Sequence, residues 1–250
     1  MIPKILHYCW FGGAPLPARA KKCIESWKTY FPEHEIKEWN ETNYNINKIP
    51  YITEAHNAKK YAFVSDYARF DILYQYGGVY FDTDVEVIKS FDHILANGPF
   101  LGIETAGRIN PGIGCAFTAG QSVLQEILEL YQNLDFLNSV EENITIVDIA
   151  TRVFARHGFT DSNSIQKIAD VTIYPTEYFN PLDYDTHYLK KTSNTFSIHH
   201  GDASWVEHNR QITANIHIWL CRIFGKKIGV FLSGKIRKTA KLMYRFLKAK

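Results

Sequence analysis

The stretch from Ser65 to Glu86, SDYARFDILYQYGGVYFDTDVE, decides the fold of this chain. Its first part completes a run with helical apolar spacing over residues 58–76, and the two glycines that follow end that run as a left-handed helix cap would. The apolar residues 79–87 then predict a strand, or a strand that leads into a loop. A helix that passes through a short turn into a strand is a typical unit of an α/β sheet.

Helical and extended patterns alternate on either side of this stretch. Apolar or alternating segments predict strands over residues 4–11, 35–39, 99–104, 170–174 and 195–200. Helical spacing predicts helices over residues 17–30, 122–133 and 146–156. The alternation predicts an α/β fold in which a mainly parallel, Rossmann-like sheet carries helices on both faces. Ligands of such sheets bind beyond the carboxyl ends of the strands.

Two charged residues on the predicted helix, Asp66 and Arg69, are three positions apart and therefore share one face. An ion pair on a helix surface has the same spacing and contributes only about 0.3–0.5 kcal/mol to stability. The spacing alone therefore favours a plain surface pair over a binding site.

The predicted strand places two carboxylates, Asp82 and Asp84, two residues apart within an apolar pattern. In an extended chain, residues two apart point to the same side. Like charges held close together are costly unless a cation or a hydrogen-bond donor satisfies them. Mg²⁺ and Mn²⁺ prefer oxygen ligands and bind together with phosphates, so this pair is suited to hold a metal ion against a diphosphate.

The same segment resembles the DXD sugar-binding segment of glycosyltransferase family 32, which includes yeast-type mannosyltransferases and bacterial capsule enzymes and is related to the clostridial glucosylating toxins. IPKILHYCWFGG, residues 2–13, resembles the opening strand of the family, and IHHGDASW, residues 198–205, resembles its closing segment. The resemblance covers residues 1–207. It implies a GT-A fold, Mn²⁺ or Mg²⁺ as cofactor, and transfer that retains the anomeric configuration of the donor sugar.

The resemblance also implies roles for residues of the central motif. Asp66 and Arg69, with Ser65 beside them, would contact the donor. Asp82 and Asp84 would be the DXD pair, which binds the metal ion and the donor, with Asp84 the firmer metal ligand. Asp66, Arg69, Asp82 and Asp84 are therefore the expected catalytic residues.

Residues outside the central motif gain roles from the same resemblance. His199 would complete the metal or diphosphate site, with His200 as the alternative, because only one of two adjacent side chains in a strand faces the cleft. The expected contacts to the nucleotide are Ser204 and Trp205 at the diphosphate and Trp10 or Phe11 near the base. The turn-rich loop over residues 110–114 lies where members of the family often place donor or acceptor contacts.

The reaction implied is transfer of a hexose from a nucleotide sugar, favoured to be UDP-linked, to a sugar acceptor in capsule, exopolysaccharide or lipid-linked glycan synthesis. An acceptor hydroxyl would displace the nucleoside diphosphate, while the metal ion and His199 offset the charge that builds up on its phosphate. UDP-galactose, UDP-glucose, UDP-N-acetylglucosamine and GDP-mannose all stay open as donors. Retention through a covalent intermediate or by same-face attack also stays open.

Two other classes of function compete with transfer. In a haloacid-dehalogenase-like phosphatase, the first aspartate of such a pair is a nucleophile beside Mg²⁺, a role that Asp82 could take. Two positions beyond the second aspartate stands Glu86, however, where a small hydroxyl or β-branched residue is usual, and Asp66 and Arg69 are left unexplained. The other alternative is a non-catalytic membrane-binding protein, for which the basic C-terminal segment argues.

Composition places the chain among ordinary globular proteins. Its 250 residues, 46% hydrophobic and 22% charged, are enough for one well-buried domain with a small extension. The four cysteines form no CxxC pair and no zinc-ligand spacing, which indicates a reduced, cytoplasmic protein. The N-terminal residues lack the pattern of a signal peptide, and no uncharged apolar run of about 18 residues predicts a membrane-spanning helix.

Charge is distributed unevenly along the chain. Residues 1–207 carry 17 of the 28 Lys and Arg and all 26 Asp and Glu, whereas residues 208–250 carry eleven basic residues and no carboxylate. The expected organisation is a GT-A catalytic domain over 1–207 and a basic amphipathic helical extension over 208–250. One helical stripe in this extension consists of Lys235, Lys238, Lys241, Arg245 and Lys248. The pattern predicts peripheral binding to the anionic inner face of a bacterial membrane, and the net acidic body disfavours nucleic acid.

Overall fold

The computed structural model describes residues 1–201 and 208–236, and the side chains of 1–201 and 215–236. The chain divides into two compact units. Unit 1 consists of Met1–Pro181 and Lys191–His200, and unit 2 of Leu182–Lys190 and Gly201–Lys250. Unit 2 thus takes in a short segment upstream of the predicted extension. The boundary expected after residue 207 stays a prediction.

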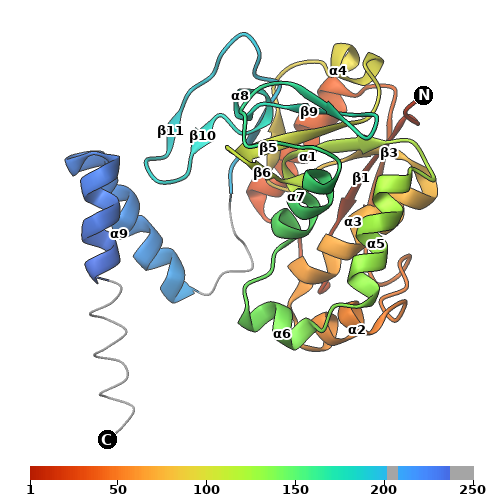
Figure 1. Cartoon of the computed structure of the whole chain (residues 1–250), viewed down its shortest axis with the longest axis horizontal. Helices are drawn as coiled ribbons and strands as arrows, with labels where there is room; N and C mark the ends of the chain where they lie inside the picture. Colours follow the sequence, from red (N-terminus) through yellow and green to blue (C-terminus); the bar gives the residue numbers. More distant parts are fainter. Residues whose placement is uncertain (202–207, 237–250) are drawn as a thin grey trace, which may run out of the picture. The chain divides into compact units, whose positions relative to one another are not determined.

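Unit 1 is built on a central sheet. Within the described residues this sheet has eight strands in the order β2-β1-β3-β7-β5-β9-β8, with β6 paired to β5 (Figure 1). Their bounds are β1 Ile5–Cys9, β2 Glu35–Trp39, β3 Gly78–Tyr80, β5 Phe100–Thr105, β6 Arg108–Ile109, β7 Cys115–Phe117, β8 Gln166–Ile168 and β9 Val171–Tyr174. β1, β2, β3, β5 and β9 run in one direction, and β6, β7 and β8 run against them. The mainly parallel sheet expected from the sequence is confirmed, with antiparallel β7 inserted between β3 and β5.

Each face of the sheet carries its own hydrophobic core, because successive side chains of a strand point to opposite sides. On β3, Val79 belongs to one core and Tyr80 to the other. The Val79 face is covered by α1 (Ala18–Tyr30), α4 (Asp92–Ala96) and α8 (Thr176–Phe179). The Tyr80 face is covered by α2 (Pro50–Asn57), α3 (Tyr61–Tyr76), α5 (Ser122–Gln132), α6 (Phe136–Glu141) and α7 (Ile146–Arg156). The expected helices on both faces are therefore confirmed.

Helix α3 ends where the sequence predicted. Gly77 follows its last residue with a φ of 64°, in the region that glycine adopts without strain, and its N–H donates to the Leu73 carbonyl. The predicted start at residue 58 is wrong. The preceding residues form the separate helix α2, and Lys59, with a φ of 57°, lies in the turn between the two helices.

The two carboxylates of the DXD motif lie in a turn, so the second of the two expected forms, a strand that leads into a loop, is found, and the extended chain assumed for the carboxylate pair is wrong. β3 ends at Tyr80 and β4 begins at Val85, and between them the Val85 N–H donates to the Asp82 carbonyl at 3.0 Å. β4 (Val85–Val87) is not part of the central sheet and pairs antiparallel with β12 (Ser197–His199). The turn therefore carries the chain from the central sheet to a second, two-stranded sheet.

Trp27 of α1 fixes the end of this turn. Its side chain is completely buried, and its indole N–H donates to the Val85 carbonyl at 2.7 Å. Its ring also packs against Phe81, with 5.8 Å between the ring centroids. The motif is therefore held by a helix that lies more than 50 residues earlier in the chain.

Unit 2 contains the short hairpin of β10 (Leu182–Asp183) and β11 (Tyr188–Leu189), the helix α9 (His208–Phe224) and a further helical segment over 226–236. Lys226 joins hairpin and helices, since its Nζ lies 2.8 Å from Asp183 Oδ2 and 2.9 Å from Asp185 Oδ2. In the described part of the chain, no helix has the length and apolar character needed to cross a membrane. Most of the predicted basic stripe, from Lys238 to Lys248, lies outside the described residues.

We predict that Trp27→Phe lowers the free energy of unfolding by about 1–3 kcal/mol, because the buried Val85 carbonyl loses its donor while much of the packing is kept. Urea unfolding followed by circular dichroism measures this. Trp219→Phe is the matched control, since Trp219 is 57% exposed and should change stability by no more than about 0.5 kcal/mol. Equal stability of the two variants would contradict the role given to Trp27.

Candidate active site

Three segments that are distant in sequence meet at the edge of unit 1 where the parallel strands end. Helix α3 supplies Asp66 and Arg69, the turn after β3 supplies Asp82 and Asp84, and β12 supplies His199. Because β7 is antiparallel, it begins at this edge, and the 3-10 turn Pro111–Ile113 in front of it also lies here. The group therefore lies beyond the carboxyl ends of the parallel strands, where ligands of such sheets bind.

Arg69 is the centre of the group. It is only 3% exposed, and its Nη2 lies 2.8 Å from Asp66 Oδ1 and 3.2 Å from Asp82 Oδ1. The ion pair within α3 is therefore buried and shared with the DXD turn, so the plain surface pair favoured by the spacing alone is wrong. A buried guanidinium requires such partners, because an uncompensated buried charge costs several kcal/mol (about 3–5).

Tyr80 contacts both members of the Arg69–Asp82 pair. Its ring centroid lies 4.9 Å from the guanidinium carbon, and its hydroxyl donates to Asp82 Oδ1 at 3.1 Å. Sequence reasoning missed Tyr80, since a tyrosine in an apolar strand is usually a core residue. The available signal was its position two residues before Asp82.

Asp84 and His199 form the second pair of the site. Val85 is the register partner of His199 in the β4–β12 ribbon, which brings His199 Nε2 to 3.3 Å from Asp84 Oδ1. Burial disfavours the charged form of this imidazole, but the hydrogen bond and negative charge of Asp84 outweigh burial and raise the pKa of His199. His200 lies 2.9 Å from Glu86 through Nε2 and Oε2, so His199 is the histidine that faces the DXD turn.

Gly112 lies in contact with the Arg69–Asp82 pair. Its carbonyl accepts the Asp82 N–H at 3.0 Å. A Cβ at this position would overlap Asp82 Oδ2 and would lie 2.9 Å from Arg69 Nη1. Asn110 holds the turn, since its side chain accepts the Gly112 N–H at 2.7 Å and donates to Glu104 Oε1 at 3.0 Å. The sequence marked this loop only by its turn-forming composition.

The remaining predicted site residues are placed as follows. Trp10 follows β1, is partly exposed, and donates its indole N–H to the Ala14 carbonyl. Phe11 is buried in the core with its ring 5.9 Å from that of Tyr44, so Trp10 is the candidate with accessible surface. Ser65 is partly exposed on α3, and its carbonyl accepts from Arg69 Nε at 3.3 Å. Ser204 and Trp205 lie outside the described residues.

Asp84 and His199 are the residues of this group that could hold a divalent cation, since a carboxylate oxygen suits Mg²⁺ or Mn²⁺ and the two side chains already lie 3.3 Å apart, from His199 Nε2 to Asp84 Oδ1. Asp82 is already engaged by Arg69 and Tyr80, and among the described residues no three His, Cys, Asp or Glu side chains form a ready metal cluster. Mg²⁺-like ions are often held by one or two carboxylates, with water and substrate phosphates completing the shell.

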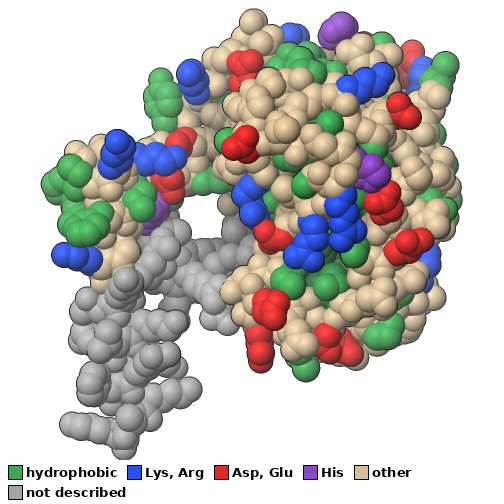
Figure 2. Space-filling model, in the orientation of Figure 1, with side chains coloured by type: hydrophobic (Ala, Val, Ile, Leu, Met, Phe, Trp, Pro, Cys, Tyr) green, Lys and Arg blue, Asp and Glu red, His purple; other side chains and the backbone are tan. Residues whose placement is uncertain are grey.

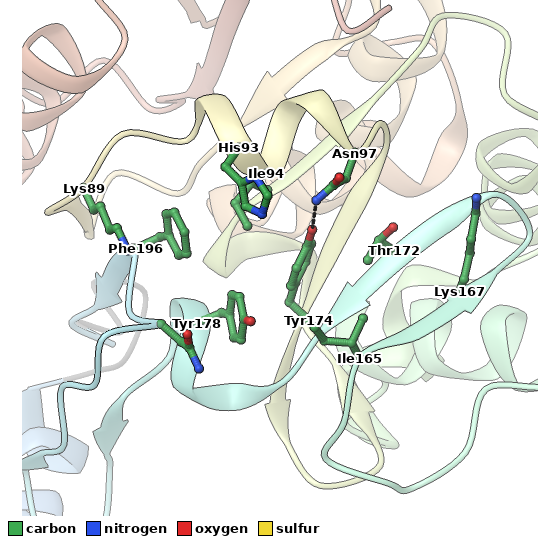
Figure 3. A pocket seen from close by; sticks show the side chains of 11 residues that line it. Lys89, His93, Ile94, Asn97, Ile165, Lys167, Thr172, Tyr174, Tyr178 and Phe196 are labelled. Atoms are coloured by element: carbon green, nitrogen blue, oxygen red, sulfur yellow. Dashed lines mark hydrogen bonds between the residues drawn. The ribbon is translucent and has the colours of Figure 1, made fainter.

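Figure 3 shows a separate pocket of unit 1, with a volume of about 450 Å³. Its lining comes from α4 and the residues on either side of it, from β8, β9 and α8, and from the segment before β12, and it includes Lys89, His93, Asn97, Lys167, Tyr174, Tyr178 and Phe196. Tyr178 and Phe196 stack at 13° with centroids 5.9 Å apart, and Asn97 donates to the Tyr174 hydroxyl at 3.2 Å. None of the site residues predicted from the sequence lines this pocket. It is therefore distinct from the cluster formed by Asp66, Arg69, Asp82, Asp84 and His199.

Comparison with known proteins gives a family match over part of the chain and one relative that aligns with most of it. Residues 17–101 match the model of the family described as "Glycosyltransferase sugar-binding region containing DXD motif". An uncharacterized glycosyltransferase of Acanthamoeba polyphaga mimivirus is 23% identical over 242 residues, which cover 90% of this chain and 88% of the viral protein. Inositol phosphoceramide mannosyltransferase 1 of Schizosaccharomyces pombe is 27% identical over 111 residues, 40% of this chain and 33% of the yeast protein.

Two solved structures are similar to this chain at a lower level. The PaToxG glycosyltransferase has a TM-score of 0.47 and 17% identity, over 62% of this chain and 69% of its own. A glycosyltransferase involved in the glycosylation of the major capsid of PBCV-1 has a TM-score of 0.44 and 13% identity, over 80% of this chain and 95% of its own. Similarities at these scores carry no argument about activity.

The first prediction from this site concerns pH. Burial raises the pKa of Asp66 to about 7, with Arg69 opposing the rise and Asp82 adding to it. Between the ordinary pKa of 3.8 and about 7, the folded protein keeps a proton that the unfolded chain has released, so Asp66 lowers stability as the pH rises through this window. The melting temperature of Asp66→Asn relative to wild type should therefore rise between pH 5 and pH 8. A difference that stays constant with pH would contradict this.

The second prediction concerns the close approach at Gly112. We expect Gly112→Ala to lower the free energy of unfolding by about 1–3 kcal/mol, because the added Cβ displaces Asp82 and Arg69. In an Asp82→Ala background the same substitution should cost less, and this double-mutant cycle isolates the contact. Gly234→Ala is the control, since a Cβ there meets no atom within 4 Å. An equal cost in both backgrounds would show that the clash lies elsewhere.

Proposed function

We propose that this chain, whose residues 17–101 belong to the glycosyltransferase sugar-binding region that contains the DXD motif, transfers a sugar from a nucleotide-sugar donor to a sugar-containing acceptor. The observation that carries the proposal is the buried Arg69, which holds Asp66 of α3 and Asp82 of the DXD turn together at the carboxyl edge of the sheet. Asp84 and His199 stand next in the same turn and ribbon.

Asp66 and Asp82 are suited to bind the hydroxyl groups of the donor sugar. The side chain of Asp66 is 16% exposed and that of Asp82 is 32% exposed, so each keeps accessible surface although Arg69 engages one side. Carboxylate oxygens accept hydrogen bonds from hydroxyl groups. Because Arg69 and Tyr80 fix these carboxylates before any ligand arrives, the sugar meets acceptors that need no reorganisation.

Asp84 and His199 are proposed to hold the cation, Mn²⁺ or Mg²⁺, and His199 also to face the diphosphate. When bound, such an ion stabilises negative charge on the leaving diphosphate. Asp84 supplies a hard oxygen ligand, which suits either ion. The raised pKa of His199 favours its protonated form when it is not a ligand, and that form would donate a hydrogen bond to a phosphate oxygen.

The proposed reaction is displacement at the anomeric carbon of the donor. The oxygen of an acceptor hydroxyl forms the new bond, the bond to the nucleoside diphosphate breaks, and the hydroxyl proton leaves with that group or with solvent. Retention is proposed through same-face attack. Asp66 and Asp82 are poor candidates for a covalent intermediate, because each is paired with the Arg69 guanidinium and that pairing weakens a nucleophile.

The substrates are proposed from resemblance. A UDP-linked hexose is the favoured donor, and a growing capsule, exopolysaccharide or lipid-linked glycan is the favoured acceptor. The mannosyltransferase named among the relatives keeps GDP-mannose among the donors to be tested.

The geometry disfavours the phosphatase alternative. A nucleophilic aspartate must reach a phosphorus atom freely, whereas Asp82 is engaged by Arg69 and by the Tyr80 hydroxyl. Glu86 points to His200, at 2.9 Å, and takes no part in the Asp82 group. The non-catalytic alternative gives no reason for the buried charges of Asp66, Arg69 and Asp82.

We predict that the protein releases nucleoside diphosphate from one of UDP-galactose, UDP-glucose, UDP-N-acetylglucosamine or GDP-mannose only when Mn²⁺ or Mg²⁺ is present. Asp84→Asn should lower turnover by about 10²–10³, because the leaving group loses its electrostatic stabilisation. Mn²⁺ binding in the presence of the nucleoside diphosphate, followed by calorimetry, should weaken in parallel.

Glu86→Gln is the matched control. Glu86 lies two residues after Asp84 and, like Asp84, pairs with a histidine, His200. This pair takes no part in the Asp82 group, so turnover and Mn²⁺ binding of Glu86→Gln should stay near wild type. Full turnover in excess EDTA would contradict the metal-dependent mechanism. Release of phosphate from simple phosphoesters, with no reaction on nucleotide sugars, would replace transfer by the phosphatase alternative.

A further inference from the structure

We propose that unit 2 binds an anionic membrane surface through an exposed apolar face on α9 and the helical segment 226–236. This inference goes beyond the transfer reaction and does not depend on it. The face, called here the 216–236 face, consists of Ile216, Trp219, Ile223, Phe224, Ile228, Val230, Phe231 and Ile236. Figure 2 shows hydrophobic side chains gathered beside Lys and Arg on this part of the molecule.

Exposed apolar side chains are concentrated here. Among the described residues, fourteen large hydrophobic side chains are exposed, and eight of them fall within residues 216–236. Trp219 is 57% exposed and Phe231 is 61% exposed. Single exposed hydrophobic residues are ordinary, but this concentration within 21 positions, with the gathering seen in Figure 2, points to an interaction surface.

The described helices of unit 2 pack against each other through other side chains, so the side chains of the 216–236 face stay exposed. Ile216, Trp219 and Ile223 are spaced by three and four residues, which places them on one face of α9. Leu220 and Cys221 are buried instead. A Cβ on Gly229 would overlap the backbone of Cys221, so the segment 226–236 packs against α9 at that glycine.

The charges of unit 2 favour an anionic partner. Lys226 is paired with both Asp183 and Asp185, and Asp185 Oδ1 also lies 3.0 Å from His217 Nε2, so both carboxylates have partners within the unit. From residue 208 to the end the sequence holds eleven Lys and Arg and no Asp or Glu. Lys227 is one exposed member of that set within the described residues.

Apolar side chains beside cations fit a lipid interface better than other occupants. A second copy of this chain would bring like charges together across the contact, which is destabilising. A nucleic acid would attract the cations but would leave the apolar side chains in water. An interfacial helix buries its apolar face at the boundary of headgroups and acyl chains while its cations meet anionic headgroups, such as those of the inner face of a bacterial membrane.

The test uses the full chain and vesicles of phosphatidylcholine, alone or mixed with phosphatidylglycerol, in a flotation assay. We expect binding to the mixed vesicles that weakens with added salt, and little binding to phosphatidylcholine alone. The double variant Trp219→Ser/Ile223→Ser should require on the order of tenfold more lipid for half-binding. Leu137→Ser, at a position that is 65% exposed in unit 1, is the matched control and should bind as wild type does.

Brominated lipids give a second readout that depends on the position of one residue. They quench tryptophan fluorescence at close range, so wild-type emission should fall on binding, and Trp219→Phe should bind but lose most of that quenching. Circular dichroism and nucleotide-sugar turnover on a soluble acceptor check that the variants fold and keep the proposed activity.

The proposal is overturned if the Trp219→Ser/Ile223→Ser variant binds mixed vesicles as tightly as wild type, or if wild type does not bind them at all. It is also overturned if light scattering shows a dimer that this double variant abolishes while vesicle binding is unchanged, because the face would then join two copies. If the wild-type protein binds mixed vesicles but transfers no sugar, the proposed function is contradicted and the membrane proposal is not.

Discussion

The buried guanidinium of Arg69 is the constraint on which the site depends. A cation that is 3% exposed is tolerated only because Asp66, Asp82 and the Tyr80 ring surround it. These contacts join helix α3 to the turn that follows β3, so the two halves of the central motif form one polar unit inside an apolar fold. The cost of burying charge is offset only in this arrangement, which fixes both carboxylates before any ligand is present.

The surrounding structure holds this polar cluster of Asp66, Arg69, Tyr80 and Asp82 in place. Antiparallel β7 enters the sheet between β3 and β5, and the turn in front of it brings Gly112 against Asp82 where no side chain would fit. On the other side, Trp27 holds the Val85 carbonyl and the β4–β12 ribbon brings His199 to Asp84. The site therefore has one part that the Arg69 contacts hold together and a second pair, Asp84 and His199, which we propose to hold the cation. The proposed chemistry divides along the same line, with sugar contacts at the first part and charge stabilisation at the second.

The two units show opposite uses of apolar side chains. In unit 1 they fill two cores, one on each face of the sheet, and the polar groups gather at a single edge. In unit 2 the described helices bury Leu220 and Cys221 and leave larger apolar side chains exposed. The two proposals divide along the same line, with sugar transfer assigned to unit 1 and membrane binding assigned to unit 2.

Local sequence determined many of the elements and the chemistry of the central motif. Apolar periodicity predicted α3 and its glycine cap, strand β2 was predicted with its observed bounds, and the spacing of Asp82 and Asp84 indicated a cation site. It could not show that Asp66–Arg69 is buried, that Tyr80 and Gly112 belong to the group, or which of His199 and His200 faces the motif. Those facts depend on contacts between segments 13 to more than 100 residues apart: Arg69 with Asp82, Gly112 with Asp82, and β12 with β4. Periodicity reports only the environment of a residue along its own element, and strand register and the insertion of β7 decide which distant side chains share that environment.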